Sequence, residues 1–379
     1  MNKPAVVFLG FVVAVGVVSA GGAWYTGKQL EPVLQTAVQD ANKELQRSMA
    51  GVDGTVSLEL VSLDRGLFSS TAHYRLKGQG SFFGEQNPNP ELLIVDHIEH
   101  GPLPFSRLVS LKWLPVMATS HYELEKNATT EKWFAAAKDV SPLKGVANIG
   151  YSRSVSGNLE LLPLEFKDET ASVNFSGLNL DFDSTAEGKK VKVDGYMNSL
   201  KLAVVDANGA PFDAEFAGLT VASNLEKSTF GFYTGQNTVE LSDTKLTFGP
   251  QKAVMTLKGF EQKDTSEIKD NNMSGRVDYK IDEIGYQGKP VGSAAMALSL
   301  KNIDVPSGLV LTKLYQDKMQ PVQAAAAAGQ PVPELQLTEA EQTLAEANVN
   351  QLLAAKPHLA LENLSLKTTH GESKFNLVV

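Results

Sequence analysis

The sequence predicts a mainly β protein, in which an N-terminal transmembrane helix is followed by a large antiparallel β-sheet domain with a few short helices. Three observations support this fold class. No charged residue lies between Lys3 and Lys28, apolar and polar residues alternate along much of the chain after Gly54, and turn signals separate the alternating stretches at short intervals.

The composition is that of a folded chain, and it excludes several classes of protein. Hydrophobic residues make up 42% of the 379 positions and charged residues 20%, which is ordinary for a globular protein. The net charge is -9, and basic residues cluster only as isolated pairs such as Lys189 and Lys190, so nucleic acid is not an expected partner. Cysteine is absent, which excludes disulfides, thiolate catalysis and cysteine metal ligands.

The apolar N-terminal segment determines the predicted location. Residues 4–25 are mostly Val, Ala, Gly, Phe and Leu, and as a helix they would rise roughly 33 Å, enough to cross the hydrocarbon core of a bilayer. Lys3 precedes the segment, so the positive-inside rule predicts a cytoplasmic N-terminus and an exported bulk. Trp24 and Tyr25 follow where an interfacial aromatic belt would lie. We therefore expect a single-pass signal anchor over residues 1–27.

A cleaved signal peptide is the alternative to this anchor. Val18-Ser19-Ala20 is a small-residue site that a signal peptidase could accept, with cleavage after Ala20. The uncharged run continues beyond that site through residues 21–25, which favours retention of the segment. Both alternatives export the rest of the chain.

An amphipathic helix is predicted over residues 28–50, directly after the anchor. Its apolar residues follow helical spacing with polar residues between them. They are Val33, Leu34, Ala37, Val38, Ala41 and Leu45. The glycine-containing run from Ala50 to Gly54 then ends the helix.

The remainder, residues 51–379, is predicted to be a β-rich periplasmic domain. Period-two alternation predicts strands at residues 55–60, 173–175, 178–182, 200–205, 238–248, 253–260, 275–281, 292–305, 358–364 and 374–379. The turn signals are Asp194-Gly195, Asp206-Ala207-Asn208-Gly209, Phe248-Gly249-Pro250 and Gln287-Gly288-Lys289-Pro290. Their spacing leaves no room for crossover helices, so antiparallel pairing is expected.

Helices are expected at a few places in this domain. One covers residues 127–138, and a short one covers residues 313–319. Thr338 with Glu341 three residues later forms a capping box, which predicts a further helix over residues 338–356. The alanine tract 324–328 is interpreted as a loop or frayed helix, and a mobile break near residues 320–335 would divide the domain into two sub-parts.

The most compact cluster of metal-capable residues is His97-Ile98-Glu99-His100, preceded by Asp96. Two histidines three apart converge on one ion in a helix, but the flanking apolar run and Gly101-Pro102 predict a strand that enters a turn. On a strand His97 and His100 face opposite sides. No metal site is predicted.

No other pattern assigns catalytic or cofactor-binding residues. The sequence lacks a nucleophile elbow, a P-loop, a dinucleotide glycine fingerprint and an H-E-x-x-H motif, so we expect no enzyme and no cofactor. The irregularly spaced aromatic residues Trp113, Trp133 and Phe134 are expected to lie in the core.

Several short strings occur in a characteristic order. They are residues 21–28 (GGAWYTGK), 65–70 (RGLFSS), 100–102 (HGP), 114–118 (LPVMA) and 371–373 (GES). Together they resemble the YdgA family, also called the domain-of-unknown-function 945 (DUF945) family, of Gram-negative inner-membrane proteins. The resemblance implies an uncleaved inner-membrane anchor and a periplasmic domain, and it provides no catalytic residues. Members of that family typically continue past the strand at which this chain stops.

Three functions are compatible with the sequence. The first is a non-enzymatic envelope scaffold or interaction protein whose partners are a second copy, as a homodimer, or other envelope proteins. The second is a lipid-binding groove, because the expected helices look too short to cover the sheet, although a closed sandwich or barrel would also bury its apolar face. The third is an exported hydrolase with dispersed carboxylates, which needs two carboxyl groups about 5 to 10 Å apart in a cleft, one of them desolvated.

Overall fold

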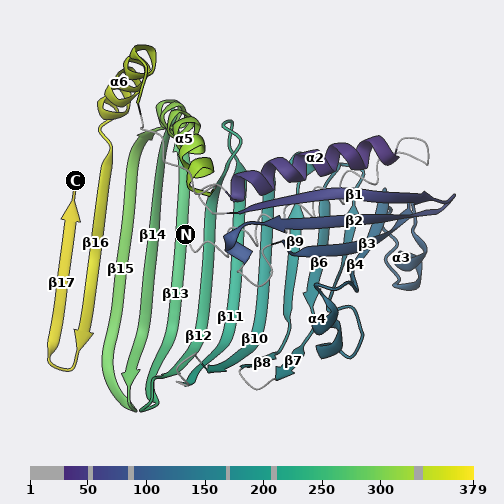
Figure 1. Ribbon diagram of the computed structural model, residues 1–379, viewed down its shortest axis with the longest axis horizontal. Coiled ribbons are helices and arrows are strands. Elements are labelled where there is room, and N and C mark those ends of the chain that lie inside the picture. Colours follow the sequence, from purple (N-terminus) through teal and green to yellow (C-terminus); the bar gives the residue numbers. More distant parts are fainter. Residues whose placement is uncertain (1–29, 50–53, 84–88, 168–170, 206–210, 328–335) are drawn as a thin grey trace. The chain divides into compact units, whose positions relative to one another are not determined.

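The computed structural model describes residues 30–49, 54–83, 89–167, 171–205, 211–327 and 336–379 (Figure 1). The chain forms two compact units. Unit 1 comprises the residues up to Asn224 together with Glu240–Thr256, and unit 2 comprises Leu225–Val239 and Leu257–Val379. Strands pair antiparallel in both units, so the predicted mainly β architecture with a large antiparallel sheet and few helices is confirmed.

Unit 1 holds the N-terminal elements. They are α2 (Leu30–Ser48), β1 (Thr55–Arg65), β2 (Ser69–Gln79), η1 (Ser81–Phe83), β3 (Glu91–His100), α3 (Phe105–Val109), β4 (Ala118–Glu125), α4 (Glu131–Ala136), β5 (Leu143–Ile149), β6 (Val155–Leu161), β7 (Leu164–Lys167), β8 (Ala171–Phe175), β9 (Leu178–Ser184), η2 (Ala186–Gly188) and β10 (Lys190–Val205). Three further strands have residues in both units: β11 (Pro211–Lys227), β12 (Tyr233–Phe248) and β13 (Ala253–Lys269). Unit 2 also holds β14 (Asn272–Tyr286), β15 (Lys289–Asp304), α5 (Val305–Ala327), α6 (Glu339–Ala354), β16 (His358–Thr368) and β17 (Gly371–Val378).

The strands of unit 1 follow one another up and down. Each of β1 to β5 pairs with the next strand in the chain, β6 pairs with β9, and β9 pairs with β10. β7 and β8 extend the β6 and β9 strands and pair with each other. The turns after β1, β3, β5 and β9 therefore lie at one end of this sheet, because successive antiparallel strands reverse direction.

One face of this sheet is dry and the other is wet. On β2 and β4, Ala72, Tyr74 and Tyr122 are buried on one face. The opposite face carries ion pairs between neighbouring strands, for example Lys144 Nζ with Glu160 Oε2 at 3.3 Å. This alternation is what an antiparallel sheet with one solvated side produces.

Helix α2 covers part of the dry face, lying along β1 (Figure 1). Leu34, Ala41 and Leu45 are almost completely buried, and all three belong to the predicted apolar stripe. The amphipathic helix is therefore confirmed, from Leu30 to Ser48. The predicted end of the helix, at residues 50–53, lies outside the described residues.

Strand β10 corrects one predicted turn. Asp194-Gly195 does not end a strand, since β10 runs without interruption from Lys190 to Val205. A Cβ on Gly195 would approach Leu180 Cδ2 to 2.4 Å. The glycine therefore makes room for a side chain of β9 and does not form a turn.

Burial along β10 decreases toward the C-terminal end of the strand. Val191, Val193 and Met197 are buried, whereas Leu200, Leu202 and Ala203 are half-buried and Val204 and Val205 are exposed. The register with β9 and β8 is continuous along the strand.

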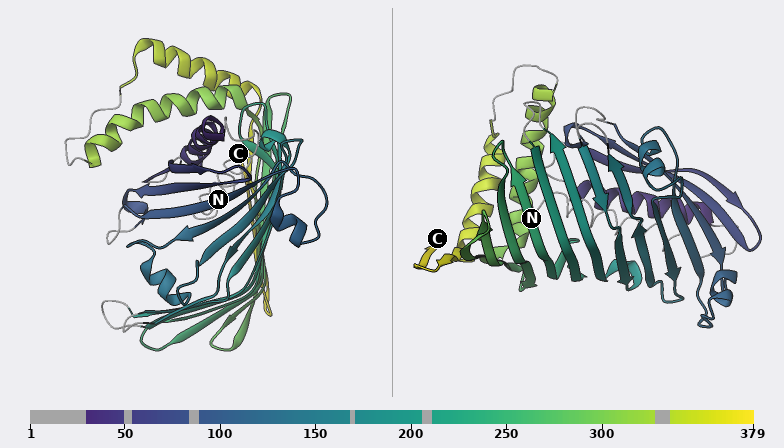
Figure 2. Two further views of the ribbon diagram at one scale, coloured as in Figure 1. Left: turned by 90° about the vertical axis from the view of Figure 1, so that its right-hand side faces the viewer. Right: turned by 90° about the horizontal axis from the view of Figure 1, so that it is seen from below.

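In unit 2, β14 to β17 form consecutive antiparallel pairs, and α5 and α6 lie side by side (Figure 2). The predicted turn at Gln287-Gly288 joins β14 to β15 through two residues with positive φ. Thr338 Oγ1 accepts from Glu341 N at 3.3 Å, and Glu341 Oε2 accepts from Thr338 N at 2.8 Å. The predicted capping box and the helix that follows it are therefore confirmed.

Helix α5 is much longer than the helix predicted at residues 313–319. It spans Val305 to Ala327 and includes Pro321 and most of the alanine tract. The prediction of a loop or frayed helix is wrong for residues 324–327, because alanine has the highest helix propensity and continues an existing helix readily. Residues 328–335 lie outside the described residues.

The helix predicted at residues 127–138 is shorter in the structure, where α4 spans Glu131 to Ala136. The predicted anchor over residues 1–27 and the hairpin signal at 206–209 fall outside the part of the chain that the structure describes. Among the described residues, none of the helices combines the length and apolar composition that crossing a bilayer requires.

Candidate functional site

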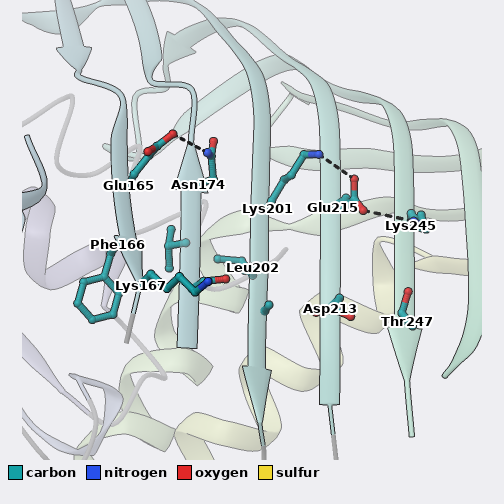
Figure 3. Close-up of a pocket in the computed structure, with 13 residues that line it drawn as sticks. Glu165, Phe166, Lys167, Asn174, Lys201, Leu202, Asp213, Glu215, Lys245 and Thr247 are labelled. Atoms are coloured by element: carbon teal, nitrogen blue, oxygen red, sulfur yellow. Dashed lines mark hydrogen bonds and ion pairs between the residues drawn. The ribbon is translucent and has the colours of Figure 1, made fainter. Parts of the chain in front are cut away.

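A polar groove of about 640 Å³ runs across β7, β8, β10, β11 and β12 within unit 1 (Figure 3). One side chain from each strand forms a row along it: Glu165, Asn174, Lys201, Glu215 and Lys245. Asn174 Nδ2 donates to Glu165 Oε1 at 2.8 Å. Glu215 lies between two ammonium groups, each with its Nζ at 3.3 Å from a carboxylate oxygen.

The charges in this groove neutralise one another. Hydrogen bonds from Lys201 and Lys245 lower the pKa of Glu215, so this carboxylate stays ionised. Lys167 and Asp213 add one further charge of each sign to the lining. Such a lining suits a polar or peptide ligand better than an acyl chain, which would leave the charged groups desolvated.

A buried carboxyl group lies elsewhere, on the dry face of the sheet. Asp96 is 3% exposed, and Ser120 Oγ donates a hydrogen bond to its Oδ1 at 2.6 Å. Burial raises the pKa of Asp96 to about 6, against the opposing effect of the Ser120 hydrogen bond. Burial, and secondarily the nearby Asp96 charge, raises the pKa of Tyr74 and of Tyr122.

This carboxyl group does not complete a hydrolytic site with the groove. Asp96 is desolvated, as a general acid would be, but it is not among the residues that line the groove. The groove carboxylate Glu215 has its pKa shifted in the opposite direction, toward the ionised form. Glycoside hydrolysis requires two carboxyl groups that face the same cleft, and Asp96 and Glu215 do not form such a pair.

The histidines of β3 are separated as the sequence predicts. His97 is exposed and its Nδ1 lies 3.2 Å from Thr71 Oγ1, whereas His100 Nε2 lies 3.1 Å from Ser70 Oγ, a buried residue. Partial burial lowers the pKa of His100. Over the described residues, no group of three or more histidine and acidic side chains is arranged to hold a metal ion.

The end of the sheet beyond β1 and β3 carries an exposed group of large apolar side chains, here called the apolar loop cluster. It comprises Leu67 and Phe68 of the β1–β2 turn and Phe105, Leu111, Trp113 and Leu114 of the β3–β4 connection. The core prediction is wrong for Trp113, which is 65% exposed, although Phe134 is buried. The connection leaves the sheet before it reaches Trp113, so the side chain has no layer to pack under.

The β3–β4 connection is nevertheless fixed to the strand ends. Ser106 donates to Glu99 Oε2 through its backbone N at 3.0 Å and through its hydroxyl at 2.5 Å. Arg107 donates to Asn148 Oδ1 at 2.8 Å and to the Leu114 carbonyl at 3.0 Å.

The β1–β2 turn is tied to the same place, because His100 N donates to the Phe68 carbonyl at 2.8 Å. The apolar loop cluster therefore belongs to one end of the sheet. Sequence reasoning missed this cluster. The signal that could have found it is the run 103–114, which is mostly apolar and holds Arg107 and Lys112 but no carboxylate.

Comparison with known proteins identifies relatives over the whole chain. The family model described as a bacterial protein of unknown function (DUF945) matches residues 1–379. The chain is 27% identical over 384 residues to Protein YdgA of Escherichia coli (strain K12), covering all of this chain and 74% of that protein. It is 23% identical over 298 residues to the uncharacterized protein YihF of the same organism, covering 78% of this chain and 60% of the relative.

A third relative is an uncharacterized protein of Haemophilus influenzae, 23% identical over 313 residues, which cover 80% of this chain and 83% of that protein. No solved structure matches the chain. The names of these relatives describe no activity that could be carried over to this chain.

Proposed function

The chain belongs to the DUF945 family of bacterial proteins of unknown function, and we propose that it is a single-pass inner-membrane protein whose β-sheet domain binds other envelope proteins in the periplasm without catalysing a reaction. The N-terminus is cytoplasmic and residues 4–25 form the anchor.

The observation that carries this proposal is the position of α2. The helix begins at Leu30, five residues after the apolar segment ends at Tyr25, and it is built into the dry face of the sheet. Glu31 in its first turn forms an ion pair with Arg65, the last residue of β1. An anchor that continues into a packed helix holds the sheet close to the bilayer, which a scaffold for membrane proteins requires.

The groove supports the interaction part of the proposal. Its polar row spans five strands, with ion pairs across three of them, and offers both donors and acceptors at fixed positions. Polar side chains of this kind give specificity to a protein interface more than they give affinity.

Alkaline extraction of membranes tests the anchor. The protein should stay in the membrane pellet, and its mature form should retain residues 1–20. Recovery in the soluble fraction with a mature N-terminus at Gly21 would overturn the anchor.

Crosslinking in intact cells tests the binding of partners. Crosslinkers should trap the protein with other envelope proteins or as a homodimer, and charge reversal in the groove by Glu215→Lys should weaken that crosslink. A matched control is Lys132→Glu, an exposed change outside the groove. Recovery of the protein at monomer size under several crosslinkers would contradict the interaction role.

A further inference from the structure

The end of unit 1 that carries the apolar loop cluster has the features of a membrane-contacting surface. Leu67, Phe105 and Leu114 are 84%, 74% and 79% exposed. Clusters of large apolar side chains this exposed are uncommon on soluble monomers unless they meet a partner or a membrane. We therefore expect a partner or a membrane to cover this surface.

The charge around the cluster indicates what that occupant is. The segments 65–69, 101–117, 150–154 and 185–190 end neighbouring strands on this side, and each carries a net positive charge. The whole chain has a net charge of -9, so these turns have the opposite sign to the rest, even though Glu31 pairs with Arg65 and Glu187 lies beside Arg153. Apolar side chains ringed by lysine and arginine are typical of surfaces that sit in the headgroup region of anionic bilayers.

The beginning of α2 lies at the same end of the sheet as the apolar loop cluster, so this surface is the one nearest the anchor. The ion pair between Glu31 and Arg65 places the beginning of α2 at this end of the sheet. From Tyr25 to Glu31 an extended chain reaches at most about 20 Å. The loops that flank Arg65 are thus held close to the point at which the anchor leaves the bilayer.

We propose that the apolar loop cluster inserts into the periplasmic headgroup layer of the inner membrane, as a second contact beside the anchor, with Lys112 and Lys189 directed at anionic lipid. This inference rests on the proposed anchor. Membrane contact at two places would fix the orientation of unit 1 and leave its far end, where α4 joins β4 to β5, in the periplasm.

The three tryptophans of the chain make a direct test. Trp24 lies in the anchor segment, Trp113 in the apolar loop cluster and Trp133 in α4 at the opposite end of the strands. Three full-length variants each keep one tryptophan and carry Phe at the other two positions. Each is reconstituted into vesicles of phosphatidylethanolamine and phosphatidylglycerol with or without bromine on the acyl chains.

The expected result is strong quenching of Trp24 and Trp113 by brominated lipid, since aromatic residues at the interface lie next to the acyl chains, while the emission of Trp133 is unchanged. Addition of Lys112→Glu and Lys189→Glu should reduce the quenching of Trp113 but not that of Trp24.

The other outcomes separate the inference from the anchor. Quenching of Trp24 with Trp113 as little affected as Trp133 would overturn the membrane contact and leave the anchor in place. Protection of Trp113 from iodide without quenching by lipid would mean that a protein covers the cluster, and would also overturn it. Equal quenching of Trp113 and Trp133 would contradict the orientation, and no quenching of Trp24 would overturn anchor and contact together.

Discussion

The side chain of Asn42 in α2 exchanges two hydrogen bonds with the backbone of Leu58 in β1: its Nδ2 donates to the Leu58 carbonyl at 2.8 Å, and its Oδ1 accepts from the Leu58 N at 2.7 Å. β1 pairs with β2 on one side, and Asn42 supplies donor and acceptor to its other side. The helix therefore occupies a strand edge that would otherwise be open to pairing with another chain.

Replacement of Asn42 should destabilise unit 1. Asn42→Ala leaves a partly buried backbone donor and acceptor without partners, and we expect a loss of about 1–3 kcal/mol in the free energy of unfolding. Chemical denaturation followed by circular dichroism measures this. Gln39→Ala, an exposed change in the same helix, is the control and should have little effect. Equal stability of the two variants would show that the contact does not hold α2 to β1.

The buried Asp96 predicts a specific pH dependence. Because its pKa is raised to about 6 in the folded protein, the folded state binds the proton more tightly than the unfolded state does. Its stabilising contribution is present below about pH 4 and is lost as the pH rises through about 6. The difference amounts to about 3 kcal/mol.

Asp96→Asn tests this directly. The amide cannot ionise but still accepts the hydrogen bond from Ser120. The variant should match the original protein near pH 4 and be more stable than it at pH 7.5, measured by denaturation at both values. A variant that is less stable at pH 7.5 would show that the ionised carboxylate has a favourable partner.

Gly145 permits close packing on the dry face. A Cβ at this position would approach the Tyr122 hydroxyl to 2.4 Å and the Asn158 carbonyl oxygen to 2.3 Å. Tyr122 crosses the glycine and donates to that same carbonyl at 2.7 Å. Gly145→Ala should therefore cost about 1–3 kcal/mol through overpacking.

The matched control is Gly308→Ala in α5, where a Cβ would meet no atom within 4 Å. Alanine should leave the stability of that helix unchanged or raise it by up to about 1 kcal/mol. If both substitutions had the same effect, packing against Tyr122 would not explain the glycine.

Local patterns determined much of the fold and little of the candidate sites. The capping box at Thr338 and the buried stripe of α2 depend on residues a few positions apart, so they are readable in the sequence. Gly195 was misread as a turn because its role is to admit Leu180 from β9, a contact between different strands. The groove was not predictable for the same reason, since Glu215 meets Lys201 and Lys245 only after three strands align.

The exposure of Trp113 shows why apolar composition alone does not predict which residues are buried. Apolar composition predicts burial, but burial also requires an element to pack against, and the β3–β4 connection extends beyond the strands. Isolated aromatic residues are therefore weak indicators of core unless the surrounding topology is known.

Cysteine labelling tests the central claim most directly, because the chain has no cysteine of its own. Two single-cysteine proteins are compared, Lys132→Cys in α4 and Asn2→Cys before the anchor. In spheroplasts with an intact inner membrane, a membrane-impermeant maleimide should label the cysteine at position 132 at once, and the cysteine at position 2 only after lysis. Labelling at position 132 that appears only after the inner membrane is broken would contradict a periplasmic domain held by an N-terminal anchor.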